Sequence, residues 1–155
     1  MTATSMPSFL KWVAEADKSR MGDPLWSVQA YRLGVYAVAC HTFDRTENAE
    51  LRKAAALDQL TRSIGSIPAN ISEGYSRSSI ADRTRFYGYA LGSTRESIDW
   101  YDSLLPELGQ VAEDRKATLT QIRRLLLTTL KNARAEGTTD VMRDRMARKH
   151  DDTAP

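Results

Sequence analysis

Charged residues of opposite sign are separated along the second half of the chain. Residues 96–114 hold six acids and no base, whereas residues 115–135 hold six bases and no acid. At about 100° per residue, most of these bases fall within about a third of the circumference of a helix: Lys116, Arg123, Arg124, Lys131 and Arg134. Such a basic stripe suits the binding of phosphate groups. It is equally compatible with pairing to Glu96, Asp99 and Asp102 of a neighbouring subunit, or with a solvated face.

One pair of residues near the end of the chain suggests RNA cleavage. Arg145 and His150 resemble the R-x4-6-H element of helical HEPN ribonucleases, in which Arg and His act on the scissile phosphate. They lie in a polar segment that has no apolar seam to hold them, whereas catalysis needs a rigid supporting shell. The structural interpretation, a solvated tail, is therefore favoured, and we predict that the chain is not an enzyme.

The sequence offers no convincing metal site. Metal sites in helical bundles commonly use Glu-x-x-His pairs, and neither His41 nor His150 has Glu three residues before it. Cys40 and His41 are adjacent, so their side chains point to different faces of a helix, and Cys40 is better explained as core filling. We predict no metal, no cofactor and no small-molecule substrate.

Length and composition indicate a single globular domain. The chain has 155 residues, 41% hydrophobic and 27% charged, with a net charge of +2. This charge is too small to imply nucleic-acid binding without the uneven distribution described above. No apolar run approaches the roughly 18 residues that span a bilayer, and the N-terminus does not resemble a signal peptide. A single cysteine favours a reducing, cytoplasmic setting.

Hydrophobic periodicity predicts helices nearly throughout. We expect a short helix over residues 8–20 and four long ones over residues 25–43, 47–73, 80–105 and 111–135. The second long helix has an a/d seam formed by Leu57, Leu60, Ile64, Ile67 and Ile71. The last has an inward row formed by Leu119, Ile122, Leu126 and Leu130.

Four long helices joined by short loops predict an all-α, antiparallel up-down four-helix bundle. We expect three parts: an N-terminal extension (1–23), the bundle (24–136), and a loose, polar C-terminal tail (137–155). The first and third long helices carry apolar residues on two sides, which predicts self-association.

Two motifs carry a more specific signal. The stretch QLTRSIGSIPANISEGYSR places polar or small residues at Gln59, Arg62, Ser66, Asn70, Glu73, Gly74 and Arg77. The stretch ALGSTRE adds Gly92, Ser93 and Glu96. Both resemble the signature of the 23S rRNA intervening-sequence proteins, with Ser63 where that family often has Ala and Asp44 where it usually has Pro. The residues themselves are compatible with a recognition site, but one-turn spacings such as Glu73 to Arg77 are also normal helix or interface chemistry.

The resemblance implies an antiparallel four-helix bundle that assembles into homopentamers, without a known catalytic activity. Distant relatives serve as accessory proteins of diversity-generating reverse transcriptases, so RNA or a reverse transcriptase is an implied partner. Our interpretation is a self-associating scaffold or RNA-binding module that acts through the basic stripe. An accessory subunit of a reverse transcriptase, a purely structural oligomer and a HEPN-like ribonuclease are the alternatives.

Overall fold

The computed structural model describes residues 5–16, 18–48 and 56–151, with side chains no further than Gly137. The described part contains only helices. In chain order these are α1 (Phe9–Ala14), α2 (Lys18–Met21), the 3-10 helix η1 (Pro24–Ser27), α3 (Gln29–Glu47), α5 (Leu57–Tyr75), α6 (Ile80–Ser103), α7 (Leu105–Leu108) and α8 (Gln110–Asp151). The predicted all-α class is confirmed.

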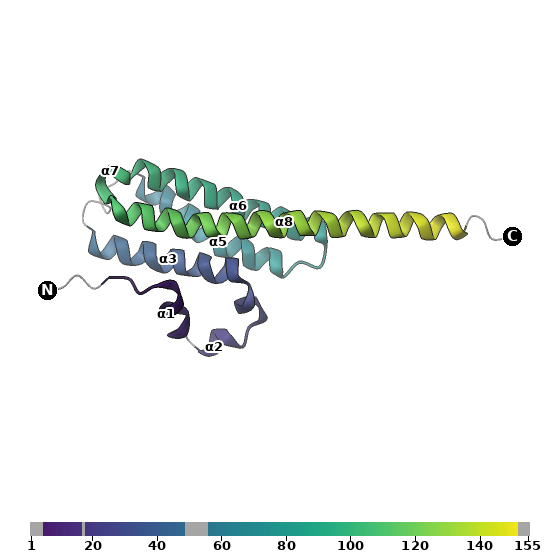
Figure 1. Ribbon diagram of the computed structural model, residues 1–155, viewed down its shortest axis with the longest axis horizontal. Helices are drawn as coiled ribbons and strands as arrows, with labels where there is room; N and C mark the ends of the chain where they lie inside the picture. The colour runs from purple at the N-terminus through teal and green to yellow at the C-terminus, as the bar shows by residue number, and fades with distance from the viewer. Residues whose placement is uncertain (1–4, 17, 49–55, 152–155) are drawn as a thin grey trace.

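Helices α3, α5, α6 and α8 form a four-helix bundle (Figure 1). Helix α3 packs against α5 and α8, and α6 packs against the same two helices, so the four surround one core. Short connections join α5 to α6 and α6 to α8, and they make each of these pairs antiparallel. The predicted bundle is confirmed.

The core contains the residues that helical periodicity selects. Four positions of the α5 seam are buried, as is the inward row of α8. These are Leu60, Ile64, Ile67 and Ile71 on α5, and Leu119, Ile122, Leu126 and Leu130 on α8. Both rows repeat every three or four residues, which keeps their side chains on one face of a helix.

Helices α5 and α6 are joined by polar as well as apolar contacts. The hydroxyl of Ser97 on α6 donates to that of Ser63 on α5 over 2.9 Å, and both residues are buried. Ser63 in turn donates to the carbonyl of Leu60, so neither buried hydroxyl is left without a partner. The side chain of Ser79 accepts from the amide of Asp82 and caps the start of α6, as its position predicts.

The N-terminal segment differs from its prediction. One helix was expected over residues 8–20, but the structure has two short ones, α1 and α2. Aromatic contacts place this segment on α3, because Phe9 and Trp12 both pack against the ring of Tyr36. The Tyr36 hydroxyl also donates to the carbonyl of Pro7 over 2.8 Å. These contacts with α3 thus set the path of the N-terminal segment, and the hydrophobic periodicity of that segment cannot predict them.

The boundary between the first two bundle helices was also predicted incorrectly. Helix α3 continues past Phe43 to Glu47, and α5 begins only at Leu57, not near Glu47. Residues 49–55, which the prediction gave to the second helix, lie outside the described residues. The extra turn of α3 places Asp44 inside the bundle.

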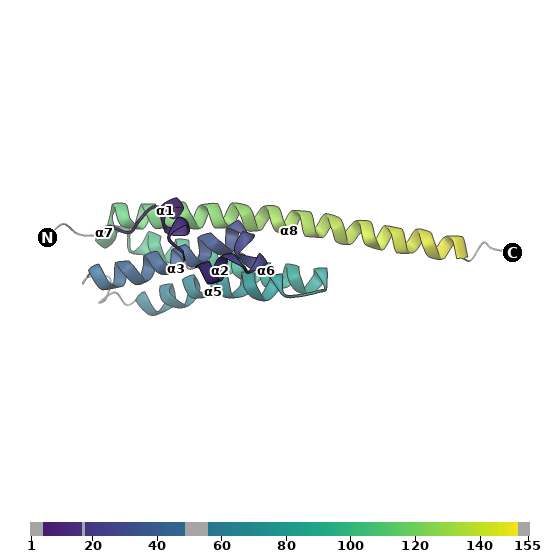
Figure 2. The ribbon, with the colours of Figure 1, turned by 90° about the horizontal axis from the view of Figure 1, so that it is seen from below.

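Two features set the path of the last helix. Gly109 has a φ of 51°, a left-handed conformation that suits glycine, and it ends α7 just before α8 begins. Helix α8 does not end near Ala135, as predicted, but continues to Asp151. It runs well past the ends of the other helices in both views (Figures 1 and 2). Within the described residues, no helix combines the length and apolar character that crossing a bilayer requires.

Candidate nucleic-acid interface

The predicted basic stripe lies on α8 beside the buried leucine row. Arg124, Lys131 and Arg134 are exposed, and Arg123 is half-buried at the edge of the core. No acid occurs between residues 115 and 135. Within the described residues, no ion pair involves Arg123, Arg124 or Lys131. This part of α8 therefore presents positive charge that neighbouring helices do not neutralise.

Lys116 differs from the rest of the stripe. Its ammonium group pairs with Asp102 on α6 and with Glu113 one turn earlier on α8. The hydrogen bond to Asp102 raises the pKa of Lys116, which favours its charged form. The sequence left open a pairing of this lysine with acids of a neighbouring subunit, but the structure shows the pairing inside one chain. Lys116 is thus the least available of the predicted phosphate contacts.

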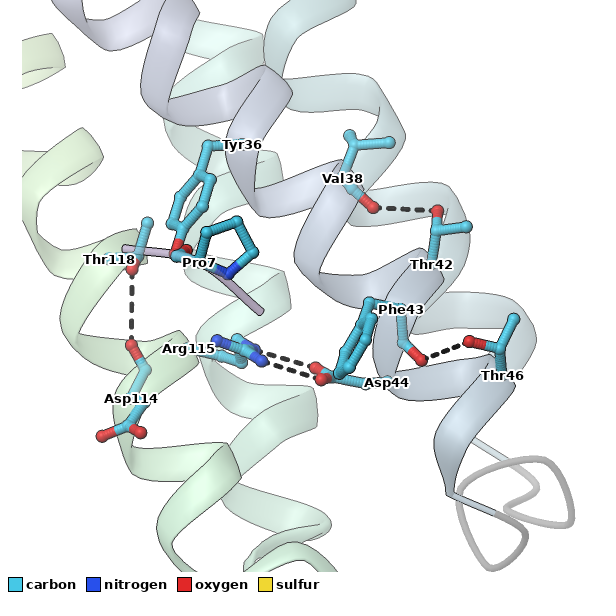
Figure 3. Close-up of polar contacts among 10 residues, drawn as sticks. All are labelled: Pro7, Tyr36, Val38, Thr42, Phe43, Asp44, Thr46, Asp114, Arg115 and Thr118. Atoms are coloured by element: carbon cyan, nitrogen blue, oxygen red, sulfur yellow. Dashed lines mark hydrogen bonds and ion pairs between the residues drawn. The ribbon is translucent and has the colours of Figure 1, made fainter. Parts of the chain in front are cut away.

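Arg115 belongs to the same run of bases but has a structural role. It projects toward α3, where its Nε and Nη2 donate to the two carboxylate oxygens of Asp44, each over 2.8 Å (Figure 3). The side chains are 15% and 5% exposed, so this bidentate pair is largely removed from solvent. Burial opposes the charge on Arg115, but the hydrogen bonds to Asp44 outweigh it and raise the pKa of the guanidinium. The pair ties the end of α3 to the start of α8.

The interior next to this pair does not form a binding cavity. Cys40, Tyr101 and Arg115 border a space that is too small to admit a water molecule. The Tyr101 hydroxyl is buried without a hydrogen-bond partner, and burial raises its pKa. Cys40 is a buried free thiol, which confirms its prediction as core filling.

Asp44 was not predicted as a site residue, although the sequence contains a signal for it. It lies four residues after Cys40 and eight after Tyr36, and so continues a row of α3 that is otherwise buried. A carboxylate on a buried row requires a partner. Only the fold shows which of the distant bases provides it.

The family-motif residues lie on α5 and α6, except Arg77, which follows the end of α5, and many of their contacts are with residues close in the sequence. Asn70 donates to the carbonyl of Ser66 over 2.9 Å, Glu73 pairs with Arg77, and the Trp100 indole donates to Glu96 over 3.3 Å. The carbonyl oxygen of Ser93 lies 2.8 Å from the Ser97 hydroxyl, whose one hydrogen is shared between this carbonyl and Ser63. Gln59, Arg62 and Gly92 are exposed.

Arg77, just after α5, contacts α6 twice: its guanidinium lies 5.0 Å from the centre of the Phe86 ring, and its carbonyl accepts from Arg83. The structure does not bring the motif residues of α5 together with the basic stripe of α8, because these two helices do not pack against each other. Their interactions are those of helix and helix-pair stabilisation.

The two motif glycines have opposite surroundings, which yields a stability prediction. A Cβ added to Gly74 would lie 2.8 Å from the Tyr87 ring and 3.2 Å from the carbonyl oxygen of Arg83, whereas one added to Gly92 meets nothing within 4 Å. We expect Gly74→Ala to lower the free energy of unfolding by about 1–3 kcal/mol. Gly92→Ala should raise it by about 0.5–1 kcal/mol, because alanine favours the helix. Urea denaturation of both variants measures this; equal effects would show that α5 and α6 do not approach as described.

The residues that the sequence raised as candidates for catalysis or metal binding do not belong to the basic stripe. Arg145 and His150 lie on the projecting part of α8, where the helix is described but the side chains are not. His41 is buried and contacts Thr61 through its Nε2. No group of three or more His, Cys, Asp or Glu suited to a metal occurs among the residues that the structure describes.

Comparison with known proteins agrees with the architecture. The model of the family described as 23S rRNA-intervening sequence protein matches residues 31–130. A crystal structure of a protein of unknown function from the S23 ribosomal protein family of Bacteroides thetaiotaomicron is 26% identical, with a TM-score of 0.56, over 66% of this chain and 94% of that one. No curated protein matches the sequence. The family match spans most of α3, all of α5 and α6, and the part of α8 that packs in the bundle. The chain belongs to the 23S rRNA-intervening sequence protein family.

Proposed function

We propose that this protein is a cytoplasmic, non-enzymatic bundle that self-associates and binds nucleic acid, RNA in particular, through the basic residues of α8. The observation that carries the proposal is the positive charge of Arg123, Arg124 and Lys131 on α8, which no ion pair among the described residues neutralises. Phosphate contacts require positive charge and reach but no base-reading geometry. Arginine and lysine side chains on one side of a rigid helix meet that requirement.

Pairing along α8 supports the choice of these residues. Arg115 and Lys116, at the start of the basic run, are already bound to Asp44 and to Asp102. Further along α8, Arg123 is half-buried and Arg124 and Lys131 are exposed, and no acid occurs between residues 115 and 135. The fold thus neutralises one end of the run and leaves the other end to solvent or a ligand.

Self-association is supported by apolar side chains of α3 that the bundle core covers only in part. Tyr31, Val35 and Val38 lie on one side of α3 and are only half-buried. They line a hollow of about 620 Å³ together with Trp26 and Pro68. Copies assembled through this surface would repeat the basic stripe, and avidity would strengthen weak contacts of each subunit. Sedimentation at micromolar concentration should show an oligomer, and a pure monomer would contradict this part of the proposal.

Charge reversal provides the test of RNA binding. We expect Arg123→Glu/Arg124→Glu to weaken binding to a single-stranded RNA by about 10–100-fold at low salt, because each phosphate contact contributes to a salt-dependent affinity. The matched control is Lys11→Glu/Arg62→Glu, which changes the net charge equally at exposed positions on α1 and α5. Fluorescence anisotropy measures the affinity, and sedimentation checks that the oligomer persists.

The outcomes separate the three sequence-based interpretations of the stripe. Loss of affinity in the α8 variant alone, with the oligomer intact, supports phosphate binding. Loss of the oligomer identifies the stripe as a subunit contact. Equal affinities of the wild type, the α8 variant and the control would mean that the stripe is only a solvated face.

A further inference from the structure

The face of α6 that adjoins the basic stripe can be identified from two contacts. Lys116 near the start of α8 pairs with Asp102 near the end of α6. At the other end, a Cβ added to Gly137 of α8 would lie 3.8 Å from Ile80 at the start of α6. Two antiparallel helices joined at these points share a fixed register. The Asp102 side of α6 is therefore the side next to the stripe.

This register places one further base beside the stripe. Arg95 precedes Asp102 by seven residues, about two turns, so it lies on the same side of α6. Along the bundle axis it lies level with Arg123 on α8. Its side chain is exposed, and no ion pair involves it among the described residues. Sequence alone could not select Arg95, because the pairing of helix faces is needed.

The same side of α6 carries two glycines. Gly88 lies seven residues before Arg95, and Gly92 lies one turn after Gly88. A Cβ at either position would meet no atom within 4 Å. The backbone of α6 is thus uncovered at Gly88 and Gly92, level with the part of α8 that leads to Lys131.

Charge divides this side of the bundle into two halves. The half near the α7 turn contains Asp99 and Asp102, and Lys116 is neutralised there. In the other half, α6 contributes Arg95, and no acid occurs between residues 115 and 135 of α8. Positive charge from both helices is therefore concentrated in the half with the glycines.

We infer that α6 contributes to the nucleic-acid interface, with Arg95 as a further phosphate-binding residue and with Gly88 and Gly92 allowing the sugar–phosphate backbone to approach α6 closely. This inference rests on the proposed function and extends the proposed interface from α8 alone to a surface shared by α6 and α8. We call this surface the α6–α8 face and define it by Arg95, Arg123, Arg124, Lys131 and Arg134. Recognition is through the backbone of the ligand, so it tolerates different sequences and falls steeply with salt.

Neutralisation of single arginines tests the role of Arg95. We expect Arg95→Gln to weaken RNA binding by about 3–10-fold and to reduce the slope of log K against log salt by about one contact. Arg85→Gln is the matched control, since Arg85 is exposed on the same helix but already pairs with Asp82. It should leave both quantities close to those of the wild type.

Failure of this inference is distinguishable from failure of the proposed function. If Arg123→Glu/Arg124→Glu weakens binding but Arg95→Gln behaves like Arg85→Gln, the ligand contacts α8 alone and the inference is wrong. If neither variant weakens binding, the proposed function is wrong as well, and the inference falls with it.

Substitutions of Gly88 test the close approach. Gly88→Ala adds one methyl group into open space and should keep RNA binding, whereas Gly88→Glu adds a carboxylate to the face and should weaken binding by at least about tenfold. Circular dichroism checks that both variants keep the fold. Equal affinity of the two variants would overturn the inference.

A second copy of the chain is the alternative occupant of this face, because Leu127 lies within it and is 44% exposed. Leu127→Ser removes this apolar side chain and changes no charge. We expect the variant to keep its oligomeric state and its RNA affinity. Dissociation of the oligomer by Leu127→Ser or by Gly88→Glu would show that the α6–α8 face is a subunit contact and would overturn the inference.

Discussion

Replacing Arg115 with methionine is expected to lower the free energy of unfolding by about 3–5 kcal/mol, because it leaves the Asp44 carboxylate buried without its partner. Both guanidinium–carboxylate hydrogen bonds measure 2.8 Å, and Asp44 is 5% exposed. The substitution keeps most of the apolar stem of the side chain. The loss therefore reports the charge pair, and urea denaturation measures it.

Two further variants make this prediction specific. Lys116→Met removes the adjacent base, whose partners Asp102 and Glu113 are about half exposed, and should cost much less stability than Arg115→Met. Asp44→Leu/Arg115→Met removes both buried charges and should recover most of the stability lost in Arg115→Met. A cost below about 1 kcal/mol for Arg115→Met would show that the pair is not buried in solution.

Acidification is expected to destabilise the protein through His41. The Thr61 hydroxyl donates to the carbonyl of Leu57, so it accepts from Nε2 of His41, and Nδ1 is left buried without a partner. Protonation of Nδ1 would place a charged, unpaired donor in the core. Burial, and then the positive charge of Arg45, lower the pKa of His41 to about 4, while Asp44 acts in the opposite direction.

The direction of the pH effect follows from this lowered pKa. The unfolded chain binds a proton at His41 below about pH 6.5, whereas the folded protein does so only near pH 4. The stability contributed by neutral His41 is complete above pH 6.5 and is lost as the pH falls toward 4. The loss amounts to about 3 kcal/mol at pH 4.

Comparison with His41→Gln separates the effect of protonating His41 on stability from the effect of protonating Asp and Glu side chains. The glutamine amide can still donate to Thr61 but does not titrate. We expect the wild type to lose about 3 kcal/mol more than His41→Gln between pH 7 and pH 4, measured by urea denaturation at each pH. Parallel curves for the two proteins would show that His41 titrates in the folded state as it does in the unfolded one.

Sequence was sufficient where local chemistry decides the structure. The α5 and α8 seams repeat every three or four apolar residues, and a side chain at such a position has few alternatives to the core. The cap of α6 is likewise local, since the Ser79 hydroxyl accepts from a free amide at the start of that helix. These features identify four long helices, and four amphipathic helices with short loops favour a bundle.

Sequence was insufficient where distant parts of the chain meet. The break between α1 and α2 accompanies packing against Tyr36 on α3. The end of α3 lies one turn later than predicted, and Arg115, 71 residues away, holds its buried Asp44. Polar composition suggested an end of α8 near Ala135, but polar residues with good helix propensity can extend an exposed helix.

The candidate interface shows the same division. A helical wheel identifies the stripe on α8, since it needs only the positions of the bases in one helix. It cannot show that Lys116 is neutralised by Asp102 or that Arg95 joins the stripe, because both depend on the register of α6 against α8.

Lysine footprinting tests the central claim, that nucleic acid binds the basic part of the α6–α8 face. Lys131 lies on this face and is exposed, Lys11 is exposed on α1, and Lys116 is held by Asp102 and Glu113. Acetylation with an activated ester, followed by mass spectrometry, measures each lysine with and without a single-stranded RNA at low salt. We predict that RNA protects Lys131 and leaves Lys11 reactive, with Lys116 slow in both cases. Acetylation of Lys131 at an unchanged rate, even at the highest RNA concentration, would contradict the claim.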